Sequence, residues 1–138
     1  MKKINGFTLI ELIIAVAIIG ILTALTYPTY INFLLQSRRT DALTALIQAQ
    51  FTLESCYAQN FSYIQKCGLL PTFPHPSEQG YYYITLTHLG TSTYTLQATP
   101  TGTQTKDKQC TNFTLNQTNV KTAIDATDTI QPDCWNPK

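Results

Sequence analysis

The side chains of this sequence that could carry out chemistry are few and lie far apart. Its two histidines, His75 and His88, belong to no metal-binding motif, and its acidic residues are scattered along the chain. No Gly-rich phosphate loop occurs either. We therefore predict that the protein is not an enzyme and that it has no catalytic residue, no metal site and no cofactor.

The four cysteines predict disulfide bonds rather than a metal site. Cys56, Cys67, Cys110 and Cys134 include no C-x-x-C pair, which argues against zinc. In an oxidising compartment four cysteines form two disulfides, and three connectivities are open.

Glu11 is the only formal charge of residues 7–27, which are mostly Leu, Ile, Ala and Val. As a helix this segment reaches about 31 Å, enough to cross a hydrocarbon core of about 30 Å. Lys2 and Lys3 precede it, which predicts a cytoplasmic N-terminus. A secretory signal peptide is disfavoured because the run is too long and no small-x-small cleavage site ends it. A charge inside a membrane span costs roughly 2.5–3.5 kcal/mol, so we expect Glu11 to have a functional partner.

The charge of the chain makes no case for nucleic acid as its main partner. The formal net charge is +1, and it falls to −1 when residues 1–6, with their two lysines, are removed. The later lysines are too dispersed along the sequence to indicate a DNA-binding module: Lys66, Lys106, Lys108, Lys121 and Lys138.

The stretch GFTLIELIIAVAIIGIL at residues 6–22, behind a short basic leader, resembles the N-terminus of type IV pilins and pseudopilins. Pro28, Tyr30, the QSRRTDAL stretch at residues 36–43 and the closing Cys134–Trp135 are similar to type IVa major pilins. The resemblance covers the first third of the chain closely and the rest by layout only.

This resemblance implies that residues 1–6 are a leader peptide, which a prepilin peptidase removes between Gly6 and Phe7. It also implies N-methylation of Phe7, so that the apolar run is retained. The new positive amine then lies four residues before Glu11, on the same face of a helix whose first turn favours a carboxylate. In the family, the corresponding Glu meets the amine of a neighbouring subunit during assembly, so Glu11 is expected to be an assembly contact.

A long helix over residues 7–58 is expected to carry these groups, with residues 7–27 spanning the membrane and later forming the fibre core. Proline removes a backbone donor, so a kink is expected at Pro28, and helix propensity is weakest between Gly20 and Pro28. Over residues 41–55 the apolar arc is about twice the width that packing on one sheet requires. Two readings stay open: a groove within the same domain, or a sheet on one side and neighbouring helices of a fibre on the other. We favour the second.

Residues 59–138 are predicted to form a globular head with a loop, a four-stranded antiparallel sheet and a C-terminal disulfide-bounded loop. The strands are read from period-2 alternation at residues 81–86, 94–98, 113–115 and 120–124. Asn119 suits a left-handed turn position. The fold class is therefore α+β, with the long N-terminal helix packed on the sheet, as in the type IV pilin fold.

Two further expectations concern the head. The cysteines sort by locality into Cys56–Cys67 and Cys110–Cys134, and the second pair resembles the C-terminal disulfide loop of type IV pilins. Arg38 and Arg39, with Asp41, are expected to form a charge cluster in solvent or between subunits.

The sequence is thus identified as a type IVa pilin, a structural subunit that forms a helical homo-oligomeric fibre. The family implies a retractable surface fibre for adhesion, twitching motility and, in some bacteria, DNA uptake. It also implies a single-pass inner-membrane state before assembly, and an assembly ATPase, an inner-membrane platform and an outer-membrane secretin as partners. The rivals are a minor pilin, a type II secretion pseudopilin, and a membrane-tethered adhesin for a host surface or DNA. Pseudopilins commonly lack the C-terminal disulfide loop, which counts against that rival.

Overall fold

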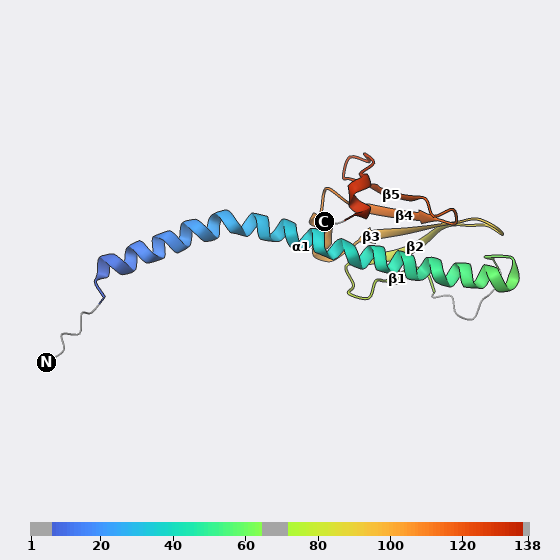
Figure 1. Ribbon diagram of the computed structural model, residues 1–138, viewed down its shortest axis with the longest axis horizontal. Helices are drawn as coiled ribbons and strands as arrows, with labels where there is room; N and C mark the ends of the chain where they lie inside the picture. The colour runs from blue at the N-terminus through green and yellow to red at the C-terminus, as the bar shows by residue number, and fades with distance from the viewer. Residues whose placement is uncertain (1–6, 65–71, 137–138) are drawn as a thin grey trace. The chain divides into compact units, whose positions relative to one another are not determined.

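The computed structural model describes residues 7–64 and 72–136. The chain divides into two compact units, an N-terminal unit that ends at Leu34 and a head that begins at Leu35 (Figure 1). One helix, α1 (Leu9–Asn60), starts in the first unit and ends in the second. The predicted helix, residues 7–58, differs from these bounds by two residues at each end, which is the ordinary uncertainty of helix ends.

In the N-terminal unit α1 is built mostly from Leu, Ala, Ile and Val, which have no polar side chain to compete for backbone hydrogen bonds. The helix continues through Pro28, whose predicted kink stays a prediction. By length and composition, α1 is the one described helix that could cross a membrane.

The head contains a five-stranded antiparallel sheet in the order β1-β2-β3-β4-β5 (Figure 1). Short 3-10 helices follow β3 and precede the C-terminus. The elements are β1 (His75–Pro76), β2 (Tyr82–Leu89), β3 (Tyr94–Pro100), η1 (Gly102–Lys106), β4 (Asn112–Asn116), β5 (Lys121–Ile124) and η2 (Pro132–Trp135).

The sheet therefore has one strand more than the four that were predicted, and that prediction is wrong. The extra strand, β1, has only two residues and lies in the predicted loop, where no alternation could mark it. It pairs His75 with Ile84 and Pro76 with Tyr83. A proline is tolerated there because β1 is an edge strand. β2 also runs three residues beyond its predicted end, because the register shifts between Leu86 and His88 and breaks the alternation.

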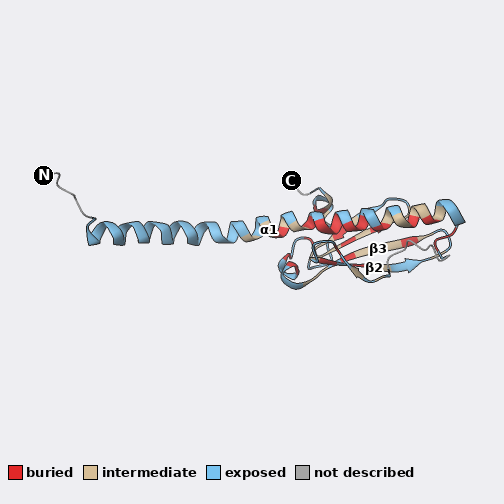
Figure 2. Cartoon of the chain, turned by 90° about the horizontal axis from the view of Figure 1, so that it is seen from below, coloured by how far each residue is buried: buried red, intermediate tan, exposed pale blue. Residues whose placement is uncertain are grey.

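The core lies between α1 and the inner face of the sheet. Alternate residues of β2, β3 and β4 are fully buried, and α1 meets them with a buried side that contains three alanines, so the helix can approach the sheet closely (Figure 2, red). The buried set includes Ala42, Leu46, Ala49, Leu53, Tyr82, Ile84, Tyr94, Leu96, Phe113 and Leu115.

The β4–β5 turn confirms the interpretation of Asn119. Asn119 has a φ of 59°, in the left-handed region that asparagine tolerates. The side chain of Asn116 fixes the turn, since its Oδ1 accepts hydrogen bonds from the backbone nitrogens of Thr118 and Val120.

Candidate assembly surface

The N-terminal unit presents an apolar surface that nothing in the described chain covers. Every residue from 7 to 30 is exposed. Soluble monomers rarely expose a contiguous apolar patch larger than about 600 Å². This surface therefore needs lipid or other protein helices around it. Its large side chains include Ile10, Leu12, Ile13, Ile14, Val16, Ile18, Ile19, Ile21, Leu22 and Leu25, each at least half exposed.

Glu11 lies at the start of α1, and its own chain binds its carboxylate. Glu11 Oε2 accepts hydrogen bonds from the backbone nitrogen of Thr8 at 2.9 Å and from Thr8 Oγ1 at 2.8 Å. In return, the backbone nitrogen of Glu11 donates to Thr8 Oγ1 at 3.3 Å. This reciprocal pair is a capping box, and its T-x-x-E signature is a local signal in the sequence. In this chain Phe7 follows Gly6, so its nitrogen belongs to a peptide bond.

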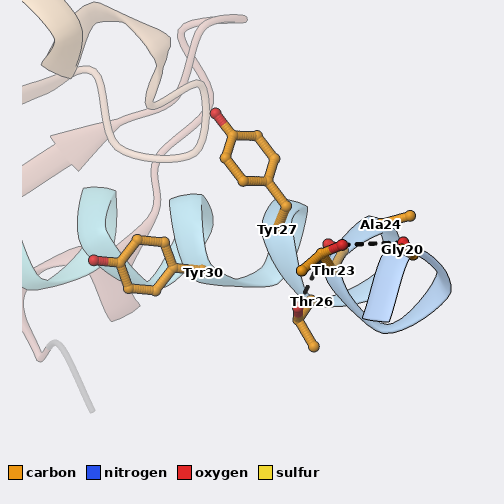
Figure 3. Close-up of a pocket in the computed structure, with 6 residues that line it drawn as sticks. All are labelled: Gly20, Thr23, Ala24, Thr26, Tyr27 and Tyr30. Carbon is orange, nitrogen blue, oxygen red and sulfur yellow. Dashed lines mark hydrogen bonds between the residues drawn. The ribbon is translucent and has the colours of Figure 1, made fainter. Parts of the chain in front are cut away.

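A shallow apolar groove lies along α1 at the segment between Gly20 and Pro28 (Figure 3). It is lined by Gly20, Thr23, Ala24, Thr26, Tyr27 and Tyr30. Thr23 Oγ1 donates to the carbonyls of Ile19 and Gly20, at 2.8 and 3.0 Å. Thr26 Oγ1 donates in the same way to Leu22, at 2.9 Å. A Cβ added to Gly20 would meet nothing within 4 Å, so no contact inside the chain requires a glycine there.

In the head, the apolar arc of α1 remains partly uncovered. Leu46 and Leu53 are fully buried against the sheet, whereas Ile47 and Phe51 are 48% and 76% exposed. These two side chains are four residues apart and share one face of the helix. One apolar side of α1 therefore packs on its own sheet and a second is left for another partner, in line with the favoured reading.

Glu54 ties the end of α1 to the sheet and to the segment after the helix. Its carboxylate accepts hydrogen bonds from Tyr94 Oη at 2.8 Å and from Tyr63 Oη at 3.0 Å. Tyr63 stacks on Tyr57 and meets Tyr94 edge to face. Burial, and then the hydrogen bond to the Glu54 carboxylate, raises the pKa of Tyr63 to about 12. The same two causes raise the pKa of Tyr94 further above its usual value.

This arrangement predicts that the stability of the head falls at high pH. The folded-state pKa values of Tyr63 and Tyr94 lie above the ordinary value of 10.0. Their contribution is therefore complete below pH 10 and is lost as the pH rises through the folded-state values. Denaturant unfolding at pH 9 and pH 11.5 measures this loss. In Glu54→Gln the hydroxyls keep an acceptor without a charge, so the loss should be smaller. Equal losses in the two proteins would contradict the role of the carboxylate.

A buried ion pair joins α1 to the loop before β4. Arg39 Nε donates to Asp107 Oδ2 at 2.7 Å, and Arg39 Nη2 donates to Asp107 Oδ1 at 2.9 Å. Asp107 Oδ1 also accepts from the backbone nitrogens of Gln109 and Cys110. Nearby, Gln104 Nε2 donates to the carbonyl oxygen of Leu35 at 2.9 Å. The network therefore positions the chain that enters the disulfide.

The predicted surface charge cluster of Arg38, Arg39 and Asp41 is wrong for two of its three members. Arg39 and Asp41 are each only 6% exposed. Arg39 pairs with Asp107, and Asp41 accepts hydrogen bonds from Ser77 Oγ and from the backbone nitrogens of Gln79 and Tyr81. These partners lie 36 to 68 residues away along the chain, where no local pattern could reveal them.

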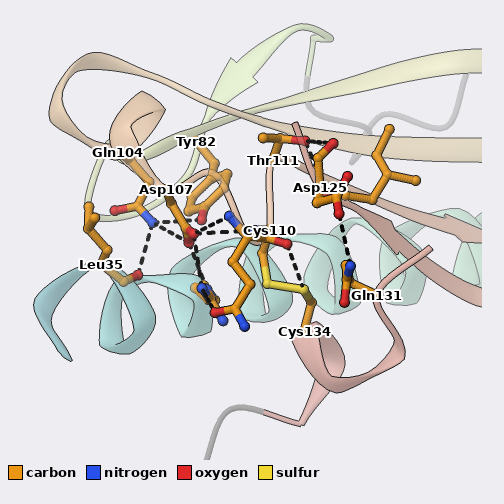
Figure 4. The surroundings of a disulfide bond; sticks show 12 residues. Leu35, Tyr82, Gln104, Asp107, Cys110, Thr111, Asp125, Gln131 and Cys134 are labelled. Carbon is orange, nitrogen blue, oxygen red and sulfur yellow. Dashed lines mark hydrogen bonds and ion pairs between the residues drawn. A yellow bond between two sulfur atoms is a disulfide. The ribbon is translucent and has the colours of Figure 1, made fainter. Parts of the chain in front are cut away.

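The structure contains the predicted Cys110–Cys134 disulfide, whose Cα atoms lie 5.9 Å apart (Figure 4). Of the other predicted pair, Cys67 lies outside the described residues, so the Cys56–Cys67 bond stays a prediction. The disulfide-bounded loop is held by Asp125, whose carboxylate accepts hydrogen bonds from Thr127, Thr129 and Gln131. These bonds lower the pKa of Asp125 to about 2. The loop therefore keeps its shape and its charge on an exposed surface.

Two family models match the chain. The model described as "Prokaryotic N-terminal methylation motif" covers residues 1–27. The model described as "Type IV minor pilin ComP, DNA uptake sequence receptor" covers residues 28–114. The apolar N-terminal helix, the sheet packed on its second half and the methylation motif define a type IV pilin. Because the second model matches more than half of the chain, the protein belongs to the type IV pilin family that this model describes.

The relatives match less than half of the chain. A "Probable minor fimbrial protein" of Dichelobacter nodosus is 45% identical over 56 residues, which is 41% of this chain and 35% of that protein. The "Type IV major fimbrial protein FimA" of the same organism is 45% identical over 57 residues, 41% of this chain and 36% of that protein. The matches thus span little more than a third of these relatives.

The fold also has a solved counterpart. The crystal structure of the Neisseria meningitidis non-core minor pilin PilV covers 72% of this chain and 95% of that chain, with a TM-score of 0.56 and 22% identity. At that identity the likeness concerns the fold alone, a long helix on an antiparallel sheet.

Proposed function

We propose that this type IV pilin is a structural subunit that polymerises through α1 into a helical surface fibre. The observation that carries the proposal is the uncovered apolar surface of residues 7–30. A membrane covers such a surface before assembly, and the helices of neighbouring subunits cover it afterwards. Ile47 and Phe51 extend the apolar surface into the head, as expected for a subunit whose helix packs against others along its length.

The proposal includes a path from the membrane to the fibre. The chain starts as a single-pass inner-membrane protein with a cytoplasmic N-terminus, is cut by a prepilin peptidase, and is assembled by an ATPase and a membrane platform. The fibre leaves the cell through a secretin and serves adhesion and twitching motility. Electron microscopy of sheared surface material, with mass spectrometry of the fibre protein, tests the subunit role. Fibres that lack this chain altogether would overturn it.

DNA uptake is the second candidate function, and a minor pilin is the form it would take. The description of the matched family, a minor pilin and DNA uptake sequence receptor, favours it. The same sheared fraction separates the roles by abundance, since a major pilin forms the bulk of the fibre and a minor pilin a trace. Loss of DNA uptake in a strain without this chain, with fibre number unchanged, would assign the receptor role.

Processing gives the first test of the proposed path. We expect the protein from assembled fibres to begin at Phe7 and to carry one added methyl group. Gly6→Val should block the cut, because a branched side chain replaces the small one beside the cleaved bond. Intact-mass spectrometry measures both changes. Assembled protein that still contains residues 1–6 would contradict the prediction.

A second test concerns the segment from Gly20 to Pro28, which we expect to lose helical hydrogen bonds in the fibre. In the bilayer an unpaired backbone group costs several kcal/mol, so the segment stays helical there. Glycine favours coil, proline lacks a donor, and the hydroxyls of Thr23 and Thr26 already compete for the carbonyls. A fibre reconstruction that resolves this segment provides the measurement, and a continuous helix there would refute the claim. Gly20→Ala combined with Pro28→Ala should give stiffer fibres or none.

A further inference from the structure

We propose that the head carries a second membrane contact, a basic patch that binds the anionic phosphate headgroups of the bilayer in which α1 is anchored. The patch consists of Arg38, Lys106 and Lys108. The inference rests on the proposed membrane-anchored state, and it concerns the subunit before it enters a fibre.

The three cations lie around one short helix. Arg38 Nη1 donates to Thr103 Oγ1 at 3.1 Å, which brings the guanidinium to η1. Lys106 is three residues after Thr103 in η1, and residues three apart in a 3-10 helix lie on the same side. Lys108 bends back to η1, where its Nζ donates to the carbonyl oxygen of Thr105 at 3.1 Å. Arg38 is partly exposed, and both lysines are exposed.

The patch keeps a positive charge because the acids beside it have other partners. Asp107, between the two lysines, is buried and paired with Arg39. Asp41 is buried under the turn before β2, where it accepts hydrogen bonds from that turn. Glu78 is exposed in the same turn, and no ion pair among the described residues joins it to the patch. The net charge of the exposed side chains in this region is therefore positive.

The covalent chain keeps this patch close to the bilayer. The exposed apolar side chains of α1 extend as far as Phe33, which is 64% exposed. Arg38 follows eleven residues after Tyr27, the end of the proposed membrane span, in the same helix, a rise of about 17 Å at 1.5 Å per residue. The polar zone of a bilayer is about 5–8 Å thick on each side, so the chain holds the patch within about 12 Å of the headgroups, and a lean of the head toward the bilayer makes the contact.

This tethering favours lipid over DNA as the occupant. Each basic side chain near an anionic surface contributes about 1 kcal/mol, an approximately fivefold preference. A contact made by three such residues is weak for a free partner, and DNA-binding proteins commonly neutralise about 6–10 phosphates. A membrane that is already attached to the chain is present at an effective concentration in the millimolar range, where weak contacts suffice. The contact would hold the head against the membrane until the subunit is drawn into a fibre.

The test uses the full chain in lipid vesicles with a fluorescent label on a cysteine introduced as Thr105→Cys, and a quencher on the lipid headgroups. In vesicles with 30% phosphatidylglycerol we expect strong quenching that is lost in pure phosphatidylcholine and in 0.5 M salt. Lys106→Gln with Lys108→Gln should lower the ratio of bound to free heads about 25-fold, from two fivefold contributions. Lys121→Gln, the matched control outside the patch, should leave quenching unchanged.

Equal quenching in the two lipids, or quenching that survives the double Lys→Gln change, would overturn the proposal. Loss of quenching on adding a short DNA duplex at physiological salt would assign the patch to DNA instead and would also overturn it. Washing the vesicles with alkaline carbonate distinguishes a failure of this proposal from a failure of the proposed function, because the wash removes protein that is not anchored in the bilayer. A chain that stays in the vesicles but is not quenched contradicts only the headgroup contact. A chain that is washed off the vesicles contradicts the membrane-anchored state itself.

Discussion

Replacing Glu11 with Gln is expected to abolish fibre assembly, or reduce it sharply, while the chain remains in the membrane. The glutamine side chain keeps an oxygen that can accept the two hydrogen bonds from Thr8, so the start of α1 should be preserved. Removing a charge from the span favours insertion on the translocation scale. What the variant lacks is the negative charge that we propose meets the Phe7 amine of a neighbouring subunit.

Fibre counts by electron microscopy, with immunoblots of the membrane fraction, measure the two effects separately. Thr8→Ser is the matched control, because it changes the same capping box and keeps the hydroxyl, so it should assemble. Normal fibres from Glu11→Gln would show that the charge is not the assembly contact.

Replacing Arg39 with Met should lower the free energy of unfolding of the head by about 3–5 kcal/mol. The change leaves Asp107, which is 3% exposed, as a buried carboxylate without its counter-ion. Without Arg39, Asp107 also holds less firmly the backbone that leads into the Cys110–Cys134 disulfide, because Asp107 accepts hydrogen bonds from that backbone. Denaturant unfolding of the full chain in detergent, followed by the emission of its single tryptophan, Trp135, gives the measurement.

Arg38→Met provides the control for this prediction, since it removes the same side chain one position earlier. Arg38 lies over the ring of Tyr81 at 4.4 Å and is partly exposed, so its loss should cost no more than about 1 kcal/mol. Similar losses of unfolding free energy in the two variants would show that the Arg39–Asp107 ion pair does not stabilise the head more than the exposed Arg38 does.

The parts of the fold that could be predicted are those with a local pattern. The apolar run and the alternation of Tyr82, Ile84 and Leu86 are legible because one periodicity continues over several residues. β1 has two residues and no alternation, so only the neighbouring strand reveals it. The bulge after Leu86 changes the period itself and hides the end of β2 in the same way.

In the candidate site, too, the local features could be predicted and the long-range contacts could not. The T-x-x-E capping box of Thr8 and Glu11 is a local signal that was available. The burial of Arg39 was not, because Asp107 is 68 residues away and an exposed arginine is the usual expectation. A residue that pairs across the fold has no signature in its own neighbourhood, so its role emerges only when the chain is folded.

The hydroxyls of Thr23 and Thr26 bear on how the fibre responds to load. Each donates to a carbonyl of the preceding turn, where it competes with the backbone nitrogen for the same oxygen and so weakens the helix at this segment. Each residue that changes from helix to extended chain adds about 1.8 Å to the subunit, the difference between the two rises. Tension on a fibre could thus be absorbed by lengthening within each subunit before any contact between subunits slips. If the segment from Gly20 to Pro28 unwinds as proposed, a fibre of such subunits lengthens first at that segment, where helix propensity is weakest.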